Sequence, residues 1–170
     1  VTTIDGDIDV AIDGDIGGDG TADVTQDVGG SSRVMNVAGG SFDLTGLIIT
    51  GGAVETVGHC AGIGVTAGGA LALDTVRSQD NAAGVAGDFS SFGGGAAILD
   101  GSSLVARDAA FTGNAASCGG GGLYVSDSAA SLVNAAFSGN VASDEYGGAI
   151  WAESGTLDLV NATVHGNTAG

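Results

Sequence analysis

The chain contains no proline and no lysine, and aromatic residues make up only 5% of its 170 residues. Together with 34 glycines, this scarcity excludes an ordinary helical or sandwich core, which needs large side chains. The 20 acidic residues outnumber three arginines and give a formal net charge of -17. Nucleic acid and anionic membranes need cationic contacts, so neither is an expected partner. No run of about 18 or more apolar residues occurs, so we expect no membrane insertion.

Glycine is abundant but has no three-residue period, which excludes collagen. Valine, isoleucine and leucine recur in register along the chain, so there is apolar surface to bury. This regularity favours an ordered fold over low-complexity disorder. The length suits a single domain that spans residues 1–170.

The register comes from a diverged repeat. Three copies end in nearly the same four residues, Phe-Thr-Gly-Asn at 111–114, Phe-Ser-Gly-Asn at 137–140 and Val-His-Gly-Asn at 164–167. Two weaker copies precede them, so that equivalent positions recur at spacings of 29, 33, 26 and 27 residues. Periods of this size are typical of a solenoid, in which each unit packs only against its neighbours.

Within each copy, apolar and polar residues alternate as in a strand, and the alternation changes phase at one position. We expect the chain to bend there, because the residues tolerate unusual backbone angles: Gly46, Thr75, Asp108, Asn134 and Asn161. A further apolar segment precedes each copy, at 62–65, 95–99, 121–125 and 147–151. The pattern predicts an all-β fold, a single-stranded parallel β-helix of about seven turns with three short strands per turn.

Regular repeats are expected over residues 41–170 and irregular Asp-rich turns over residues 1–40. An insertion loop near 84–92 would account for the longest spacing. Turns stacked about 4.8 Å apart place equivalent side chains above one another. We therefore expect Phe111 to lie over Phe137, and a ladder of stacked side chains formed by Asn81, Asn114, Asn140 and Asn167.

The N-terminal region carries eight aspartates in its first 27 residues. Hard oxygen ligands at alternate positions suit Ca²⁺, so a calcium site is one reading of Asp5, Asp7, Asp9, Asp13, Asp15 and Asp19. The other reading is that these side chains are solvated acids of β-turns, which favour aspartate. No other cofactor is expected.

The two cysteines, Cys60 and Cys118, occupy matching places two turns apart. Regular stacking would hold the sulfurs nearly 10 Å apart, too far for a disulfide, unless the insertion near 84–92 displaces the turn between them. A bridge is one alternative, since an even number of cysteines is usual in extracellular chains. A metal site that uses His59 with both cysteines is less favoured because a fourth ligand is not evident.

A carbohydrate-active enzyme, such as a polysaccharide lyase or hydrolase, is an alternative because such enzymes use parallel β-helices. Its charged groups would be Asp74, Arg77, Arg107 and Asp108 on adjacent turns. An ordinary ladder of surface ion pairs explains the same residues and is favoured. Likewise, Tyr124, Tyr146 and Trp151 fit corner packing better than a platform for sugars. We therefore expect no enzymatic activity and assign no catalytic residue.

The segment Gly-Gly-Ala-Ile at 147–150 and the Phe-x-x-Asn tetrads at Phe111 and Phe137 carry a resemblance. They resemble the paired GGAI and FxxN repeats of the polymorphic outer membrane protein family, and the chain is similar to glycine-rich β-helix passengers of bacterial adhesins. The resemblance covers residues 40–170. It implies a right-handed helix, a bacterial cell-surface or extracellular location, and a role in adhesion or scaffolding.

Neither end of the repeat shows an amphipathic helix, a proline or a basic residue that would block strand pairing. The leading expectation is therefore a non-enzymatic structural subunit that pairs with itself head to tail, and laterally through small outward residues, to form a filament or surface fibre. The second is an adhesin or autotransporter passenger fragment that binds a surface receptor or glycan through loops such as 84–92.

Overall fold

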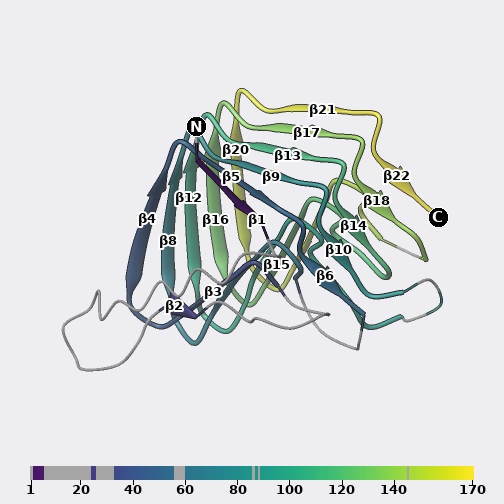
Figure 1. Ribbon diagram of the computed structural model, residues 1–170, viewed down its shortest axis with the longest axis horizontal. Helices are drawn as coiled ribbons and strands as arrows, with labels where there is room; N and C mark the ends of the chain where they lie inside the picture. Colours follow the sequence, from purple (N-terminus) through teal and green to yellow (C-terminus); the bar gives the residue numbers. More distant parts are fainter. Residues whose placement is uncertain are drawn as a thin grey trace.

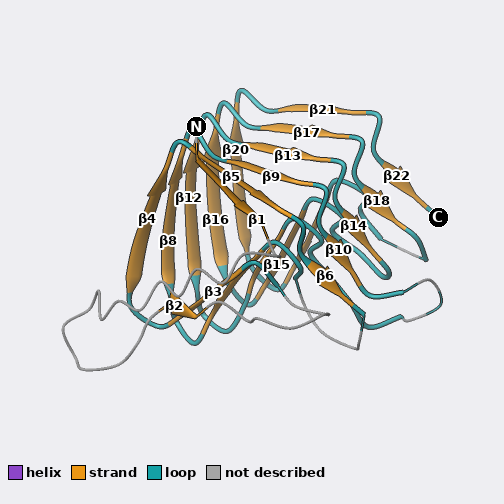
Figure 2. Cartoon of the chain, viewed as in Figure 1, coloured by secondary structure: helices purple, strands orange, loops and turns teal. Residues whose placement is uncertain are grey.

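The computed structural model describes residues 2–5, 24–25, 33–55, 60–85, 87, 89–144 and 146–170. Over these residues the chain forms strands and turns without a helix, as Figure 2 shows. The strands wind into a parallel β-solenoid with four sheets, which we number 1 to 4 in the order in which each turn visits them. Successive turns follow one another from blue to yellow in Figure 1.

Sheets 1 and 2 form the first half of every turn. Sheet 1 contains β2 (Val24–Thr25), β3 (Met35–Ala38), β7 (Ile63–Thr66), β11 (Ala96–Ile98), β15 (Leu123–Ser126) and β19 (Ile150–Glu153). Sheet 2 contains β4 (Ser41–Thr45), β8 (Ala70–Asp74), β12 (Ser103–Arg107), β16 (Ala129–Val133) and β20 (Thr156–Val160).

Sheets 3 and 4 complete the turn. Sheet 3 contains β1 (Thr2–Asp5), β5 (Leu47–Thr50), β9 (Arg77–Gln79), β13 (Ala110–Thr112), β17 (Ala136–Ser138) and β21 (Thr163–His165). Sheet 4 contains β6 (Ala53–Val54), β10 (Ala82–Ala83), β14 (Ala115–Ala116), β18 (Val141–Ala142) and β22 (Thr168–Ala169).

The predicted parallel solenoid is confirmed, but the expected three strands per turn are wrong, and the described residues account for five of the seven expected turns. The described residues form five turns of four strands, β3–β6 being the first and β19–β22 the fifth. Sheet 4 was missed because its strands are two residues long, too short to produce an alternating pattern. The turns expected within residues 1–40 fall largely outside the described residues.

The bend predicted between the second and third strand of each turn is confirmed. Its residues all have positive φ: Gly46 (68°), Thr75 (57°), Asp108 (49°), Asn134 (56°) and Asn161 (53°). Glycine and asparagine adopt this left-handed conformation most readily, whereas a β-branched residue such as Thr75 is strained by it. The bend turns the chain from sheet 2 into sheet 3 at the same place in every turn.

The core consists of inward side chains stacked along the solenoid axis. Parallel pairing aligns Phe111 with Phe137, and their rings stack with centroids 4.9 Å apart and planes 5° from parallel. This confirms the expected pair. In sheet 2, Leu73, Ala106 and Leu132 are aligned in the same way and are almost completely buried. Each side chain is thus covered by its counterparts above and below.

The asparagine ladder is also confirmed, at the corner between sheets 3 and 4. Nδ2 of Asn81 donates to Oδ1 of Asn114 (3.0 Å), Nδ2 of Asn114 to Oδ1 of Asn140 (3.1 Å), and Nδ2 of Asn140 to Oδ1 of Asn167 (2.8 Å). Each Oδ1 also accepts the backbone N–H of the preceding asparagine. The glycines before sheet 1 make room for this ladder, since a Cβ on Gly95 would lie 2.9 Å from Nδ2 of Asn114.

The N-terminal strands extend two of the sheets by one strand each. β1 pairs parallel with β5 in sheet 3, whereas β2 pairs antiparallel with β3 in sheet 1. At the other end, β19 to β22 are the last strands of their sheets. Beyond the first turn, the described strands therefore extend only sheets 1 and 3, whereas β19 to β22 form one complete turn.

The predicted insertion lies between β10 and β11, after residue 83. Its base is tightly packed, because a Cβ on Gly84 would lie 2.6 Å from Cβ of Ser91 and from Oγ of Ser117. The backbone N–H of Gly87 donates to Oδ2 of Asp144 at 3.0 Å, which ties the insertion to the fourth turn.

Candidate functional site on the outer face of sheet 2

Sheet 2 has the longest strands that recur in every turn, and their alternation sends three residues per strand to the outer face. Parallel register arranges these residues in rows that run along the solenoid axis. One row contains Asp43, Ala72 and Val105, and the next contains Thr45, Asp74 and Arg107. The sequence thus places charged groups of three different turns side by side.

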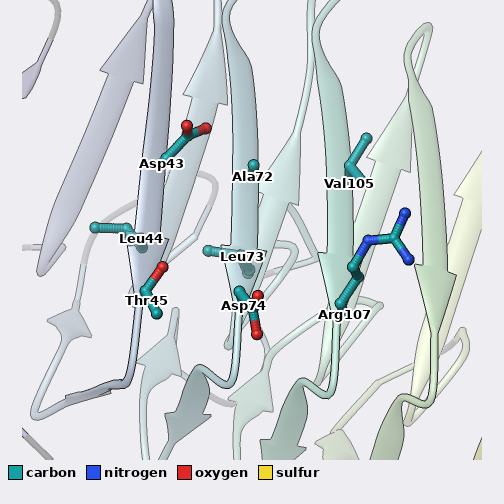
Figure 3. A pocket seen from close by; sticks show the side chains of 8 residues that line it. All are labelled: Asp43, Leu44, Thr45, Ala72, Leu73, Asp74, Val105 and Arg107. Atoms are coloured by element: carbon teal, nitrogen blue, oxygen red, sulfur yellow. The ribbon is translucent and has the colours of Figure 1, made fainter.

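These two rows form a shallow hollow of about 250 Å³ on β4, β8 and β12. Figure 3 shows the six outward side chains across the three strands, with Leu44 and Leu73 among the lining residues. Both leucines are buried and belong to the core, so the bottom of the hollow rests on packed side chains. The small side chain of Ala72, between Asp43 and Val105, leaves space at its centre.

The hollow combines hydrogen-bond acceptors, donors and an apolar surface. Asp74 lies directly opposite Arg107 in the register, and Oγ1 of Thr75 donates to Oδ1 of Asp74 at 2.8 Å. Val105 is 47% exposed, so its methyl groups are available beside these polar groups. Such a surface is suited to hold a polar ligand that also has apolar faces.

The structure brings together only part of the charged group expected for an enzyme. Asp74 and Arg107 line the hollow, but Arg77 lies in sheet 3, opposite Ala110. Asp108 lies at the bend, where its Oδ1 accepts Nδ2 of Asn134 at 3.0 Å. The four residues therefore do not share one outer strand, because the bend separates sheet 2 from sheet 3.

Sequence reasoning missed the other polar residues of the hollow. Asp43 and Thr45 come from the first described turn, whose copy of the repeat is the most diverged. Their outward position could have been read from the alternation in 41–45, because Gly46 already aligned this copy with Thr75 of the next.

A second cluster, which we call the aromatic stack, lies on the outer face of sheet 1. Ring centroids are 4.8 Å apart for Phe92 and Tyr124, 5.2 Å for Tyr124 and Trp151, and 4.7 Å for Tyr146 and Trp151. Burial is the largest of the causes that raise the pKa of Tyr124, whose hydroxyl lies 3.4 Å from Oε2 of Glu153. Tyr124 is only 5% exposed whereas Tyr146 is 49% exposed, a mixture of buried and exposed rings that agrees with corner packing. The sequence did not predict that the rings touch.

Cys60 and Cys118, both described, are buried thiols that no disulfide joins. The intervening turn is not displaced as a bridge would require, because the N–H of Cys60 donates to the carbonyl of Phe92 and the N–H of Cys118 to that of Ser91. The turn through Ser91 and Phe92 therefore lies between the two cysteines, which are two turn spacings apart. Burial raises the pKa of the Cys60 thiol from 9.0 to about 11, an effect that the charge of Arg33 partly offsets.

The calcium prediction cannot be located on the structure. Asp7, Asp9, Asp13, Asp15 and Asp19 lie outside the described residues, and only the backbone of Asp5, in β1, is described. Residue 59, the histidine considered as a metal ligand, also lies outside them. Within the described part of the chain, no three His, Cys, Asp or Glu side chains are grouped as a metal site would need.

Fold and site together define the chain as a parallel β-solenoid repeat protein with a polar hollow on one lateral face. Comparisons with family models, with curated proteins and with solved structures give no match to this chain. Among the described residues there is no helix that is long and apolar enough to cross a membrane.

Proposed function

We propose that the chain is a non-enzymatic extracellular module of the bacterial cell surface, a rigid β-solenoid that attaches to a surface receptor through its insertion. The observation that carries this proposal is an anchored insertion with two exposed apolar side chains. Phe89 is 63% exposed and Val85 is 53% exposed. Large apolar side chains exposed on a loop are typical of contact surfaces.

The anchoring of the insertion supports a binding role. Its base is packed around Gly84 and Ser91, and Gly87 is hydrogen-bonded to Asp144 on the fourth turn. A loop that is held in place loses less conformational entropy when it binds. The stacked core behind it supplies a rigid support, as an adhesin passenger needs. The acidic surface keeps the module soluble and discourages contact with polyanions.

A self-assembling filament is the second candidate, and one observation favours it. In the last turn, Leu159 is 39% exposed and Val164 is 53% exposed, whereas their counterparts Leu132 and Phe137 in the fourth turn are fully buried. A second copy could cover these side chains. We rank it second because β1 and β2 already pair with sheets 3 and 1 beside the first described turn, where a second copy would have to add its strands.

The test is binding of the fluorescently labelled chain to cultured animal epithelial cells, measured by flow cytometry with unlabelled chain as competitor. Phe89→Ser and Val85→Ser should each reduce saturable binding at least tenfold. Val160→Ser is the matched control, since Val160 is also 53% exposed but lies on sheet 2. It should bind like the unmodified chain.

Two results would contradict attachment through the insertion: no saturable binding, or equal binding by the insertion variants and the control. Sedimentation velocity of the same samples distinguishes attachment from the second candidate function, the self-assembling filament. Attachment predicts a monomer, whereas a filament predicts large species that disappear in Val164→Asp and persist in Val105→Asp. Val105 is exposed to a similar degree but lies on the lateral face.

A further inference from the structure

We infer that the hollow on sheet 2 binds a neutral sugar unit of a polysaccharide. This inference goes beyond attachment through the insertion, because the hollow lies on another sheet and uses other residues. The insertion presents an apolar surface, whereas the hollow presents charged groups around an apolar centre.

The chemistry of the lining matches a pyranose ring. Carboxylates of Asp43 and Asp74 accept hydrogen bonds from sugar hydroxyls, and the guanidinium of Arg107 donates to hydroxyl or ring oxygens. Ala72 lies between Asp43 and Val105 in its row, and both apolar side chains can contact the C–H face of the ring. A sugar uses donors, acceptors and an apolar surface together, which is what this lining offers.

Charge decides between a neutral ligand and a charged one. The net charge of -17 repels a polyanion such as a polyuronate before it reaches the surface. Within the hollow, a cation could pair with the two carboxylates but offers no acceptor to the guanidinium of Arg107, which it would leave unpaired. A neutral polyhydroxylated ligand avoids both penalties and still engages all three charged groups.

The groups of the hollow are held ready for binding. Parallel pairing of β4, β8 and β12 fixes the spacing of the three strands, and Leu44 and Leu73 anchor them in the core. The hydrogen bond from Thr75 to Asp74 orients one carboxylate, leaving its other oxygen for a ligand. The backbone and one carboxylate therefore need little further ordering on binding, which lowers the entropic cost of holding a ligand.

The experiment is an NMR titration of the whole chain that follows the methyl signals of Ala72 and Val105. The neutral probes are cellotetraose, maltotetraose and mannotetraose, while tetragalacturonate and spermidine are the charged comparisons. At least one neutral probe should shift both methyl signals saturably. Asp74→Asn and Arg107→Gln should each weaken that binding about tenfold or more, because each removes a hydrogen bond to a charged group.

Two matched controls lie outside the hollow. Asp158→Asn changes a carboxylate in the same row as Asp43 but on β20, and Arg77→Gln changes an arginine on sheet 3. Both should bind like the unmodified chain. The inference is overturned if no neutral probe gives a saturable shift, if a charged probe binds more tightly, or if the controls weaken binding as much as the hollow variants. None of these results depends on whether the insertion attaches to cells.

Discussion

The fourth and fifth turns carry nearly the same sequence pattern but differ in burial. Phe137 and Leu132 in the fourth turn are fully buried, whereas Val164 and Leu159, which pair with them in register, are about half exposed. The difference arises because the fourth turn is covered on both sides and the fifth on one. In a solenoid, therefore, a residue's contribution to stability depends on its neighbouring turns as much as on its own identity.

The largest effect should separate these two turns directly. Phe137→Ala removes a ring that stacks on Phe111, and it should lower the free energy of unfolding by about 3–5 kcal/mol. Val164→Ala should lower it by less than about 1 kcal/mol, because the side chain is already half exposed. Urea unfolding followed by the fluorescence of Trp151 measures both. Equal losses would show that the fifth turn is as enclosed as the fourth.

The asparagine ladder offers the next comparison. Asn140→Ala leaves the buried N–H and Nδ2 of Asn114 without their acceptor, and it should cost about 2–4 kcal/mol. Asn167→Ala should cost about 1 kcal/mol, since water can reach the donors of Asn140 more easily at the open end. The same urea unfolding tests the pair. A larger loss for Asn167→Ala would contradict the dependence on enclosure.

The buried thiol of Cys60 should make the stability of the folded chain depend on pH. Its folded pKa of about 11 lies above the ordinary 9.0, so the folded state holds the proton more tightly than the unfolded state. Stability is therefore full below pH 9 and falls by roughly 2 kcal/mol as the pH rises to 11.

Urea unfolding of Cys60→Ala between pH 8 and pH 11 isolates this effect. The variant should lose less stability over that interval than the unmodified chain. Burial also raises the pKa of Tyr124. The stability of both proteins therefore still declines with rising pH because of that phenol. Identical slopes for the two proteins would rule out the contribution of Cys60.

The smallest effect concerns the exposed bend, where neighbouring turns contribute least. Thr75→Gly should raise the free energy of unfolding by about 0.5–1 kcal/mol, because a β-branched residue is strained at a φ of 57°. Gly46→Thr at the equivalent bend should lower it by about 1–2 kcal/mol, although a Cβ there meets no atom within 4 Å. Thermal unfolding measures the pair, and changes of the same sign would contradict the strain.

Much of the repeat could be predicted from the sequence. The phase change in the alternation identified the bend at Asn134, and the spacing of the tetrads identified the stacked Phe111 and Phe137. Both signals are local patterns that recur in each copy. The fourth strand escaped notice because two residues cannot display a period.

The hollow was harder to predict because it depends on register across turns. Asp43 comes from a copy with little resemblance to the others, and Arg77 belongs to the same copy as Asp74 but to a different sheet. Only the strand pairing shows which of these charges are neighbours. Nor did the sequence indicate that the turn through Phe92 stays in place between Cys60 and Cys118.

Hydrogen exchange of the backbone amides tests the contrast between enclosed and open turns most directly. In the monomeric chain, amides of β16 and β17 should exchange only through global unfolding, while those of β20 and β21 should exchange much faster through local opening. Faster exchange confined to the fifth turn is the predicted result. Equal protection of the two turns would contradict the account and would mean that the fifth turn is covered, as a filament requires.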